Sequence, residues 1–361
     1  MEWLPFLKRS GVVSKEGFFT GIFSPKKEIH KVTVCDLGRT KILLLEMEKK
    51  SDHVFIHRFD ILKHASLDHK PAFVLKPFFD GKKYQKNDIR TALKGHGVVI
   101  RFIRFPKMKI EELNSVMKYE AEQYIPFELD DVVLDFAVVE ESVKTDEGEK
   151  MEVLLAVVKR KELEPTLEIF RNLECQLSLV DVDILSGMAA LEYFHPEDFS
   201  GHQGLFDLGT EISTLGIVRD GKPRFIRDIS YGTYDLQKRL KTRSNWNDDK
   251  VEQFFEKNAQ VTHEEAQVIT ESLAGLIGDL RLSFDYYRDQ VPQTKPIDKL
   301  YLSGGISHPL VQEVLSAGLQ MPVCSVDMIK KLKWAPEVDE TLLKMNLPRL
   351  PVVLGLGIRE E

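Results

Sequence analysis

The hydrophobic pattern of the first part of the chain predicts both strands and a helix. Residues 31–48 contain a β-branched run, a turn at Gly38 and a second apolar run, which predict a β-hairpin. Residues 96–106 form another apolar run that Pro106 closes. In the stretch that follows, apolar residues recur three or four positions apart, as on the buried face of a helix: Ile110, Leu113, Met117, Ala121 and Tyr124. Pro126 ends this predicted helix, because the residue before a proline is pushed towards extended geometry.

The middle of the chain continues this mixture of strands and helices. Two apolar stretches, DDVVLDFAVVEE and MEVLLAVVKRKE, flank the charged segment SVKTDEGEK and predict a long β-hairpin with a solvated tip. The segments EPTLEIFRNLEC, QLSLVDVDIL and SGMAALEYF then predict a helix, a strand and a second helix. This β-α-β-α progression is typical of a mixed α/β domain.

A second pattern of the same kind begins at Gly201. The stretch HQGLFDLGTEISTLGIVRDGKPRFIRDISYG holds three short strands, and its turn RDGK is a strong hairpin signal. Residues 234–291 are mostly helical, with an interruption at RSNWNDDK. The last predicted helix of this region has one apolar face, formed by Leu273, Leu276, Ile277, Leu280, Phe284 and Tyr287. A strand that runs into a glycine pair and the apolar ending VVLGLGIREE complete the chain.

Length and composition narrow the class of protein. The 361 residues suffice for two or three domains, and the net charge of −7 gives no general attraction to nucleic acid. Three isolated cysteines, Cys35, Cys175 and Cys324, suit buried thiols in a reducing cytosol, and the ten histidines show no metal-ligand spacing. No run approaches the roughly 18 apolar residues that a membrane-spanning helix needs. We therefore expect a soluble protein that is at most peripheral to a membrane.

Residues 1–30 form a separate N-terminal extension that lacks the apolar core of a secretory signal. We interpret it as loosely ordered. The alternative is a weak arm that binds a membrane surface or a partner through aromatic side chains among lysines, namely Trp3, Phe6, Phe18, Phe19 and Phe23.

Three short motifs that follow predicted strands carry the candidate chemistry. They are Asp36-x-Gly38, Asp207-x-Gly209 and Ser303-Gly304-Gly305. Each alone indicates only a turn, since glycine tolerates backbone angles that other residues do not. Together they suit a nucleotide held between two lobes, because N–H groups in tight turns bind phosphates. The two aspartates could hold a hydrated Mg²⁺ through water.

A duplicated α/β core with hairpin phosphate loops resembles the actin-like ATPase superfamily, and within it the chain resembles the PilM family of type IV pilus assembly. YEAEQYIPFELDDVVLDF is similar to that family's helix-to-strand segment, GLFDLGTEISTLGIVRDGKPRFIRDISYG to its second phosphate hairpin, LYLSGGIS to its nucleotide-base loop and VVLGLGIRE to its closing helix. The resemblance implies an α/β fold of two lobes. Lobe 1 would span residues 31–200, with an inserted subdomain at about 99–165, and lobe 2 would span 201–361, with a helical subdomain at about 233–297.

The resemblance also implies a site for ATP or ADP with Mg²⁺, which Asp36 and Asp207 would hold through water. The nucleotide-binding residues would be Asp36, Gly38, Arg39, Thr40, Lys41, Asp207, Gly209, Thr210, Glu211, Ser303, Gly304 and Gly305. The sequence departs from the family pattern, because Leu43 stands where a lysine is usual and Thr233 where a glycine is usual. Arg39 and Lys41 also occupy places where Ser or Thr is common. Arg39 or Lys41 could still meet a phosphate from another direction. Since catalysis of phosphoryl transfer depends on positioned charge, we expect nucleotide binding with weak or absent hydrolysis.

Asp181 and Asp183 are the candidates for orienting an attacking water, because they lie in VDVDIL between the two lobes. The alternative is structural. One of these carboxylates would then cap the helix that follows, with Asp183 or Ser186 as the cap.

The segment around Pro126 offers a candidate partner site. From the sequence alone, packing of the apolar corner Ile125, Pro126 and Phe127 into the subdomain core is the favoured interpretation. The family resemblance implies a rival, since PilM-like proteins hold the cytoplasmic N-terminal segment of PilN, an inner-membrane protein, in a groove here. Tyr124 and the corner would then bind an extended apolar peptide with a basic end. The implied protein is a cytoplasmic scaffold, peripheral at the inner membrane, that also contacts other pilus platform or motor components and could self-associate.

Two other functions share this fold. An active ATPase or sugar kinase would show an acidic residue reaching a sugar pocket and a more regular first phosphate turn. A cell-division filament protein that resembles FtsA would carry a C-terminal amphipathic membrane helix, whereas this chain stops at GIREE. Both rank below the scaffold. A homologue in type II secretion stays open, since the two machines share this architecture.

Overall fold

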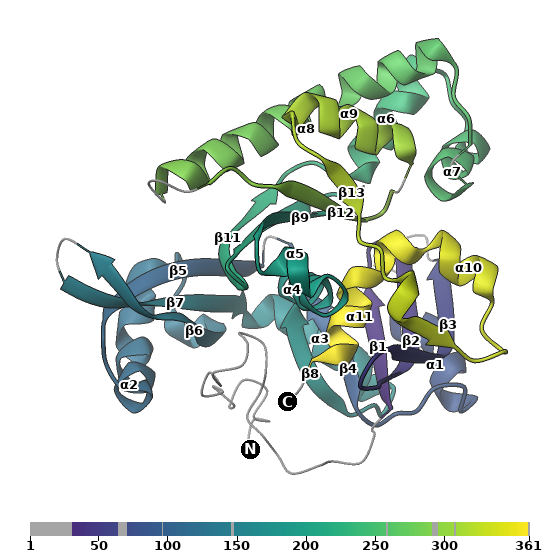
Figure 1. The fold of residues 1–361 in the computed structure, drawn as a ribbon. Coiled ribbons are helices and arrows are strands. Elements are labelled where there is room, and N and C mark those ends of the chain that lie inside the picture. The colour runs from purple at the N-terminus through teal and green to yellow at the C-terminus, as the bar shows by residue number, and fades with distance from the viewer. Residues whose placement is uncertain are drawn as a thin grey trace.

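Three β-sheets organise the fold in a computed structural model that describes residues 31–63, 71–95, 97–145, 148–257, 259–290, 295–306 and 308–359 (Figure 1). The expected extension at residues 1–30 lies outside the described residues. The strands are β1 (Val32–Leu37), β2 (Lys41–Lys49), β3 (Val54–Lys63), β4 (Ile89–Leu93), β5 (Val98–Pro106), β6 (Val132–Thr145), β7 (Gly148–Lys159), β8 (Leu177–Val182), β9 (His202–Leu208), β10 (Ser213–Arg219), β11 (Lys222–Ile229), β12 (Lys299–Gly304), β13 (Val323–Ser325) and β14 (Leu332–Trp334).

The two larger sheets repeat one arrangement. The sheet of lobe 1 has the order β14-β3-β2-β1-β4-β8, and that of lobe 2 has the order β11-β10-β9-β12-β13. In each, three antiparallel strands precede two parallel ones, so β3-β2-β1-β4-β8 corresponds to β11-β10-β9-β12-β13. The duplicated two-lobe core predicted from the sequence is therefore confirmed.

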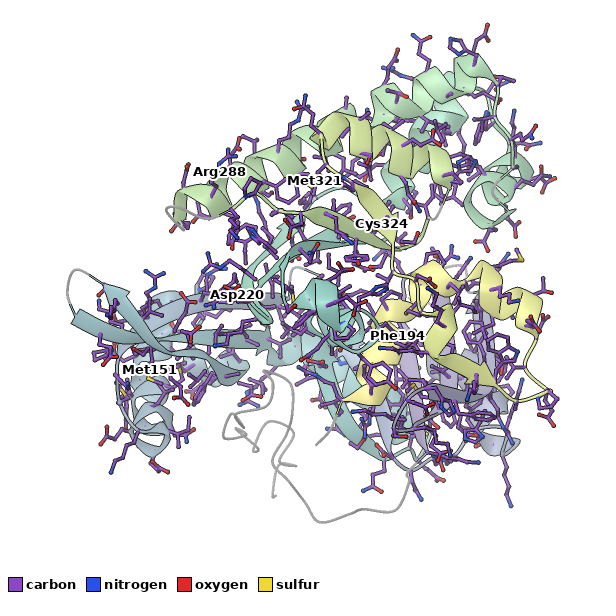
Figure 2. All side chains as sticks on the ribbon, in the orientation of Figure 1. Met151, Phe194, Asp220, Arg288, Met321 and Cys324 are labelled. Atoms are coloured by element: carbon purple, nitrogen blue, oxygen red, sulfur yellow. The ribbon has the colours of Figure 1, made fainter. Side chains whose placement is uncertain are left out.

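Helices cover both faces of these sheets. Those of the described residues are α1 (Pro71–Asp80), α2 (Ile110–Glu120), α3 (Arg160–Asn172), α4 (Asp183–Phe194), α5 (Pro196–Phe199), α6 (Thr233–Arg243), α7 (Asp248–Lys257), α8 (His263–Gln290), α9 (Pro309–Leu319), α10 (Glu340–Met345) and α11 (Leu350–Ile358). α4 and α11 share one core with both larger sheets, and Figure 2 places Phe194, at the end of α4, in this layer. α1 and α3 cover the outer face of the lobe 1 sheet, and α6 to α9 pack on the lobe 2 sheet.

The end of the chain does not stay in lobe 2, to which the predicted range 201–361 assigned it. β14 pairs in parallel with β3 of lobe 1, and α11 packs against α4, β1 and β2. Every residue of α11 is buried. A helix that is apolar on all sides must be covered on all sides, which explains why α11 lies between the lobes rather than on the surface of one.

The inserted subdomain consists of the sheet β5-β7-β6 with α2 packed on it, at the left of Figure 1. The helix predicted after residue 109 ends as α2 at Glu120 and continues as a 3₁₀ turn over Ala121–Tyr124. The subdomain was predicted to end at about residue 165, and this position lies inside α3. Phe170 of the same helix packs in the lobe 1 core with Phe79.

The three cysteines are free thiols. Cys35 is buried in the lobe 1 core, as expected, whereas Cys175 and Cys324 are half-buried. Burial raises the pKa of the Cys175 thiol to about 11, so this thiol stays protonated at neutral pH.

Candidate functional site

A cleft of about 660 Å³ lies between the two lobes. The turn after β1, the turn after β9 and the glycine pair after β12 all line it. The structure therefore brings together all but one of the residues predicted to bind nucleotide. Ser303 is the exception: it is buried behind the cleft, where its Oγ donates to Asp207 Oδ1 at 2.7 Å.

The two turns are built alike. A Cβ atom on Gly38 would lie 2.5 Å from the carbonyl oxygen of Lys41, and one on Gly209 would lie 2.2 Å from that of Ile212. Gly304 has a φ of +104°, and a Cβ there would lie 2.3 Å from the carbonyl oxygen of Leu208. Because side chains are excluded at these three positions, the backbone itself faces the cleft, as it does in turns that bind phosphate.

The start of α6 fixes the second turn. The N–H of Thr233 donates to the carbonyl of Gly209 at 2.9 Å, and the N–H of Tyr234 donates to the carbonyl of Thr210 at 2.9 Å. Thr233, which departs from the family pattern, lines the cleft. A Cβ on Gly305 would lie 3.0 Å from its Cγ2, so the second glycine of the pair after β12 makes room for the threonine.

Lys94, Asp36 and Asp207 line the cleft, and the charge of Asp183 also acts on Lys94. Lys94 directly follows β4, and its Nζ lies 3.2 Å from Asp36 Oδ1. Burial alone would lower the pKa of Lys94, but the charges of Asp36, Asp183 and Asp207 and the hydrogen bond to Asp36 raise it. Burial also raises the pKa of Asp207, against the lowering effects of Lys94 and Ser303.

Three of the other four cations that line the cleft are paired with acids of lobe 2, whereas Lys159 lies over the ring of Phe127. Arg39 Nε lies 2.7 Å from Glu211 Oε1, and Lys41 donates to Glu256 of α7. Arg349 lies 3.5 Å from the same carboxylate and donates to the carbonyl of Gly305 at 2.8 Å. Burial and the charge of Arg349 lower the pKa of Lys41, although Glu256 partly offsets this. Both cations of the first turn therefore hold lobe 2 in the described arrangement.

A second depression, of about 780 Å³, lies on the inserted subdomain. Ile125, Pro126 and Phe127 line it, together with three acids and three bases: Glu122, Glu128, Asp131, Lys159, Arg160 and Lys161. Ile125 is 7% exposed and belongs to the subdomain core, which confirms the packing interpretation for this residue. Pro126 is exposed, and Phe127 is half-buried with Lys159 Nζ 3.9 Å from its ring centroid. Tyr124 packs edge-on against Phe105 and is 37% exposed.

Comparison with known proteins decides the family. The model of a family described as "Type IV pilus assembly protein PilM" matches residues 73–361. The chain belongs to the PilM family. The solved PilM–PilN type IV pilus biogenesis complex is similar over 92% of this chain and 99% of that chain, with 23% identity and a TM-score of 0.76. The ethanolamine utilization protein EutJ from Carboxydothermus hydrogenoformans is 13% identical over 98% of this chain and 96% of its own, with a TM-score of 0.52.

The predicted fold class is confirmed by these findings. This PilM-family chain is a type IV pilus assembly protein with the actin-like ATPase fold. No helix of the described residues is long and apolar enough to cross a bilayer.

The two candidate catalytic aspartates lie in different settings in this PilM-family structure. Neither of them is among the residues that line the cleft. Asp181 accepts a hydrogen bond from Ser186 Oγ at 2.5 Å and pairs with Arg359 at 2.6 Å. Asp183 is the first residue of α4, is 4% exposed, and accepts from the N–H of Ile184 at 2.6 Å. Burial, and then the charge of Asp207, raise the pKa of Asp183 well above its usual range.

Sequence reasoning missed several residues of the PilM-family cleft. Lys94, Glu256 and Arg349 line it, but none belongs to an Asp-x-Gly or Gly-Gly turn. For Lys94 the sequence does hold a signal, because this residue directly follows a strand and two glycines come soon after it in LKGHG. The strand is a parallel neighbour of β1, and the carboxyl ends of such strands meet at one edge of a sheet.

Proposed function

We propose that this PilM-family chain is a nucleotide-binding scaffold that holds the cytoplasmic N-terminal peptide of a PilN-like inner-membrane protein. Its place would be the cytoplasmic face of the inner membrane, where it is peripheral through that partner. The observation that carries the nucleotide part is that two matched glycine turns from duplicated lobes line one cleft.

The nucleotide part is supported by the size and donors of the cleft. Its volume of about 660 Å³ falls within the range of about 300–1,000 Å³ that is typical of small-molecule sites. The turns at residues 38–40 and 209–211 would bind the phosphates of ATP or ADP through backbone N–H groups. The glycine pair at 304–305 would let the backbone approach the base closely. Arg349 donates to the carbonyl of Gly305 beside this position.

The aspartates favour binding over hydrolysis. A general base must be ionised and within hydrogen-bond reach of the attacking water. Burial, and then the charge of Asp207, disfavour the ionised form of Asp183 by raising its pKa, and Arg359 and Ser186 hold Asp181 away from the cleft. We therefore propose weak or absent hydrolysis.

A divalent cation does not fit between Asp36 and Asp207 in the described arrangement. Lys94 Nζ is already bonded to Asp36, and Ser303 Oγ holds one oxygen of Asp207. The described residues also contain no group of three or more His, Cys, Asp or Glu side chains that could hold a metal ion. The residues expected to hold Mg²⁺ through water thus face an ammonium group instead.

The peptide part is supported by the depression on the inserted subdomain. Pro126 and Phe127 offer apolar surface, and Glu122, Glu128 and Asp131 offer negative charge to a basic peptide end. An extended peptide gains affinity from pockets for alternate side chains. The similar solved structure is a complex of PilM with PilN, which supports a PilN-like occupant.

The nucleotide part is tested by a matched pair of glycine substitutions. In isothermal titration, ATP should bind the wild type, and Gly304→Ala should weaken binding by about tenfold or more, because its Cβ would displace the base loop from Leu208. Gly221→Ala also places alanine at positive φ (+72°), but no atom lies within 4 Å, so affinity should not change. Absence of ATP and ADP binding by the wild type would remove the nucleotide from the proposal. A phosphate-release assay run in parallel should show turnover at background.

The peptide part is tested with a pair of aromatic substitutions. Phe127→Ala should weaken binding of the N-terminal peptide of the cognate PilN-like protein by about tenfold in fluorescence anisotropy. Tyr119→Ala removes an aromatic ring that is 78% exposed and outside the depression, and should leave affinity unchanged. Equal capture of the peptide by the wild type and Phe127→Ala would refute the site.

A further inference from the structure

The Lys94 side chain lines the cleft, and the charges of three aspartates act on its ammonium group. Because β1 and β4 are parallel neighbours, Lys94 at the end of β4 lies at the same sheet edge as Asp36 of β1. The distance from its Nζ to Asp36 Oδ1 is 3.2 Å. Asp183 of α4 and Asp207 of β9 act on the same ammonium group through their charges.

These carboxylates need a cation if an anion is to bind beside them. Asp183 and Asp207 are 4% and 9% exposed, and buried carboxylates are kept in proteins only when they are paired or hydrogen-bonded. Other cations line the cleft, but Arg39 pairs with Glu211, Lys41 and Arg349 pair with Glu256, and Lys159 lies over the ring of Phe127. Lys94 is thus the cation that faces the aspartates.

The Lys94 side chain can also reach a phosphate. It is 38% exposed and lines the cleft together with both turns. An ammonium group has three donors, so the bond to Asp36 leaves two of them for phosphate oxygens. Lysine binds phosphate as a compact charge on a flexible stem, which suits a contact that forms only when the ligand arrives.

We propose that Lys94 is the resident cation of this cleft, contacts the terminal phosphates of the nucleotide, and makes nucleotide binding independent of Mg²⁺. This inference rests on the proposed nucleotide site. In this proposal the ammonium group of Lys94 neutralises the negative charges of both the carboxylates and the phosphates, as a divalent ion does where both share one site.

The test is isothermal titration of the full chain with ADP, in excess EDTA and in excess MgCl₂. For the wild type the two dissociation constants should agree within about threefold, and for Lys94→Gln the EDTA value should be weaker by about tenfold and recover with Mg²⁺. Lys94→Arg keeps the charge and should behave like the wild type. Lys238→Gln removes an exposed lysine of α6 that is outside the cleft and is the matched control.

A second measurement follows the metal alone. Electron paramagnetic resonance with Mn²⁺ and no nucleotide should detect no bound ion at this site in the wild type and a bound ion in Lys94→Gln, where the carboxylates have lost their cation. Circular dichroism confirms that the variants are folded.

Loss of wild-type ADP binding in EDTA with recovery in Mg²⁺ would overturn the role of Lys94 and leave the proposed nucleotide site intact. Unchanged ADP affinity of Lys94→Gln in EDTA would overturn it as well. Binding in neither buffer would overturn both the inference and the proposed nucleotide site.

Discussion

At the scale of single residues, buried carboxyl groups make the stability of the chain depend on pH. Glu192 of α4 is half-buried in the layer between the lobes. Burial raises the pKa of its carboxyl from the ordinary 4.5 to about 7, although the charges of Arg359 and Lys49 oppose the shift. Between these two values the folded chain keeps a proton that the unfolded chain has lost. The free energy of unfolding therefore falls as the pH rises through this window.

Glu192→Gln should remove the loss of stability that ionisation of this carboxyl causes. Below the window the carboxyl is protonated in both states, so at about pH 4 the variant should match the wild type. At about pH 8 the variant should gain about 1–2 kcal/mol in the free energy of unfolding, less than the full shift implies because the group is partly solvated. Urea denaturation at the two pH values measures the difference.

Glu168→Gln, which changes an exposed carboxyl of α3, is the control and should have no effect at either pH. An equal gain from Glu192→Gln at both pH values would show that the ionised carboxylate is not the cause.

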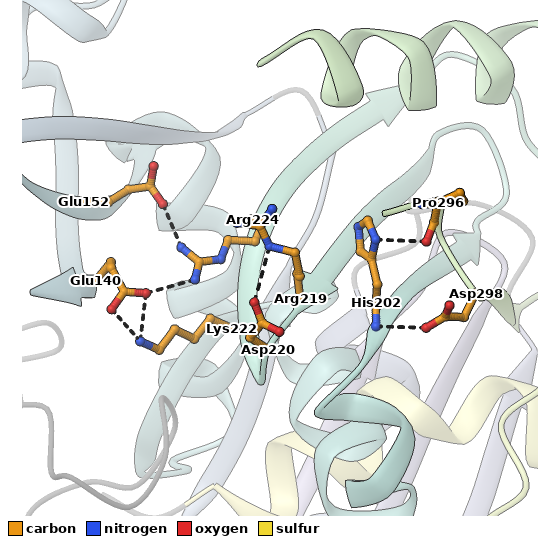
Figure 3. Close-up of polar contacts among 9 residues, drawn as sticks. All are labelled: Glu140, Glu152, His202, Arg219, Asp220, Lys222, Arg224, Pro296 and Asp298. Carbon is orange, nitrogen blue, oxygen red and sulfur yellow. Dashed lines mark hydrogen bonds and ion pairs between the residues drawn. The ribbon is translucent and has the colours of Figure 1, made fainter. Parts of the chain in front are cut away.

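At the scale of elements, β11 of lobe 2 is joined to the β6–β7 hairpin of the inserted subdomain by a charged junction (Figure 3). Arg224 of β11 lies 2.9 Å from Glu140 of β6 and 3.0 Å from Glu152 of β7. Lys222 donates to both oxygens of Glu140 at 3.0 Å. The Arg224 and Glu152 side chains are 9% and 12% exposed, whereas Lys222 is 33% exposed. The junction connects the subdomain that carries the depression around Pro126 to the lobe that carries the turn after β9.

The two bases of this junction should contribute unequally. Arg224→Met should lower the free energy of unfolding by about 1–3 kcal/mol, because the mostly buried Glu152 then depends on Arg104, whose Nε lies 3.2 Å away on a side chain that is 47% exposed. Lys222→Met should cost less than about 1 kcal/mol, since a partly solvated pair is screened by water. Guanidinium denaturation measures both. Losses of equal size would show that burial does not set the strength of the junction.

The elements themselves could be predicted where the signal is local. The β1–β2 and β6–β7 hairpins and α2 lie close to the predicted ranges, because side-chain periodicity and turn residues act over a few positions. The return of β14 to lobe 1 could not be predicted, since its residues pair with residues of β3 that are 278 positions away in sequence and parallel pairing leaves no local mark.

The same limit applies to the site. The Asp-x-Gly and Gly-Gly turns could be found because tight turns need glycine. The pair Lys41 and Glu256 could not, since 215 residues separate its members and neither belongs to a motif. The sequence therefore did not predict the ion pairs that Glu256 makes with Lys41 and Arg349. It also did not predict Lys94 beside Asp36.

At the scale of the whole molecule, ion pairs join the lobes across the cleft that the nucleotide would enter. Lys41 of lobe 1 is held by Glu256 of α7, and Arg349 is held by the same carboxylate. One helical turn earlier, Glu252 pairs with Lys63 outside the cleft lining. The phosphates of ATP and the carboxylate of Glu256 are both anions, so in the proposed site they would compete for the same two cations. Binding would then break contacts between the lobes as well as form new ones.

Removing this competitor should tighten binding. Glu256→Gln takes one negative charge out of the cleft and frees Lys41 and Arg349, so ATP should bind about fivefold more tightly in isothermal titration at physiological ionic strength, which corresponds to about 1 kcal/mol. Glu252→Gln breaks a pair whose side chains are 61% and 50% exposed. It should leave the dissociation constant unchanged, because screened surface pairs contribute little. Weaker binding by Glu256→Gln would mean that the carboxylate contacts the nucleotide itself, and the ion pairs would then serve to position Glu256 for the ligand rather than to oppose its entry.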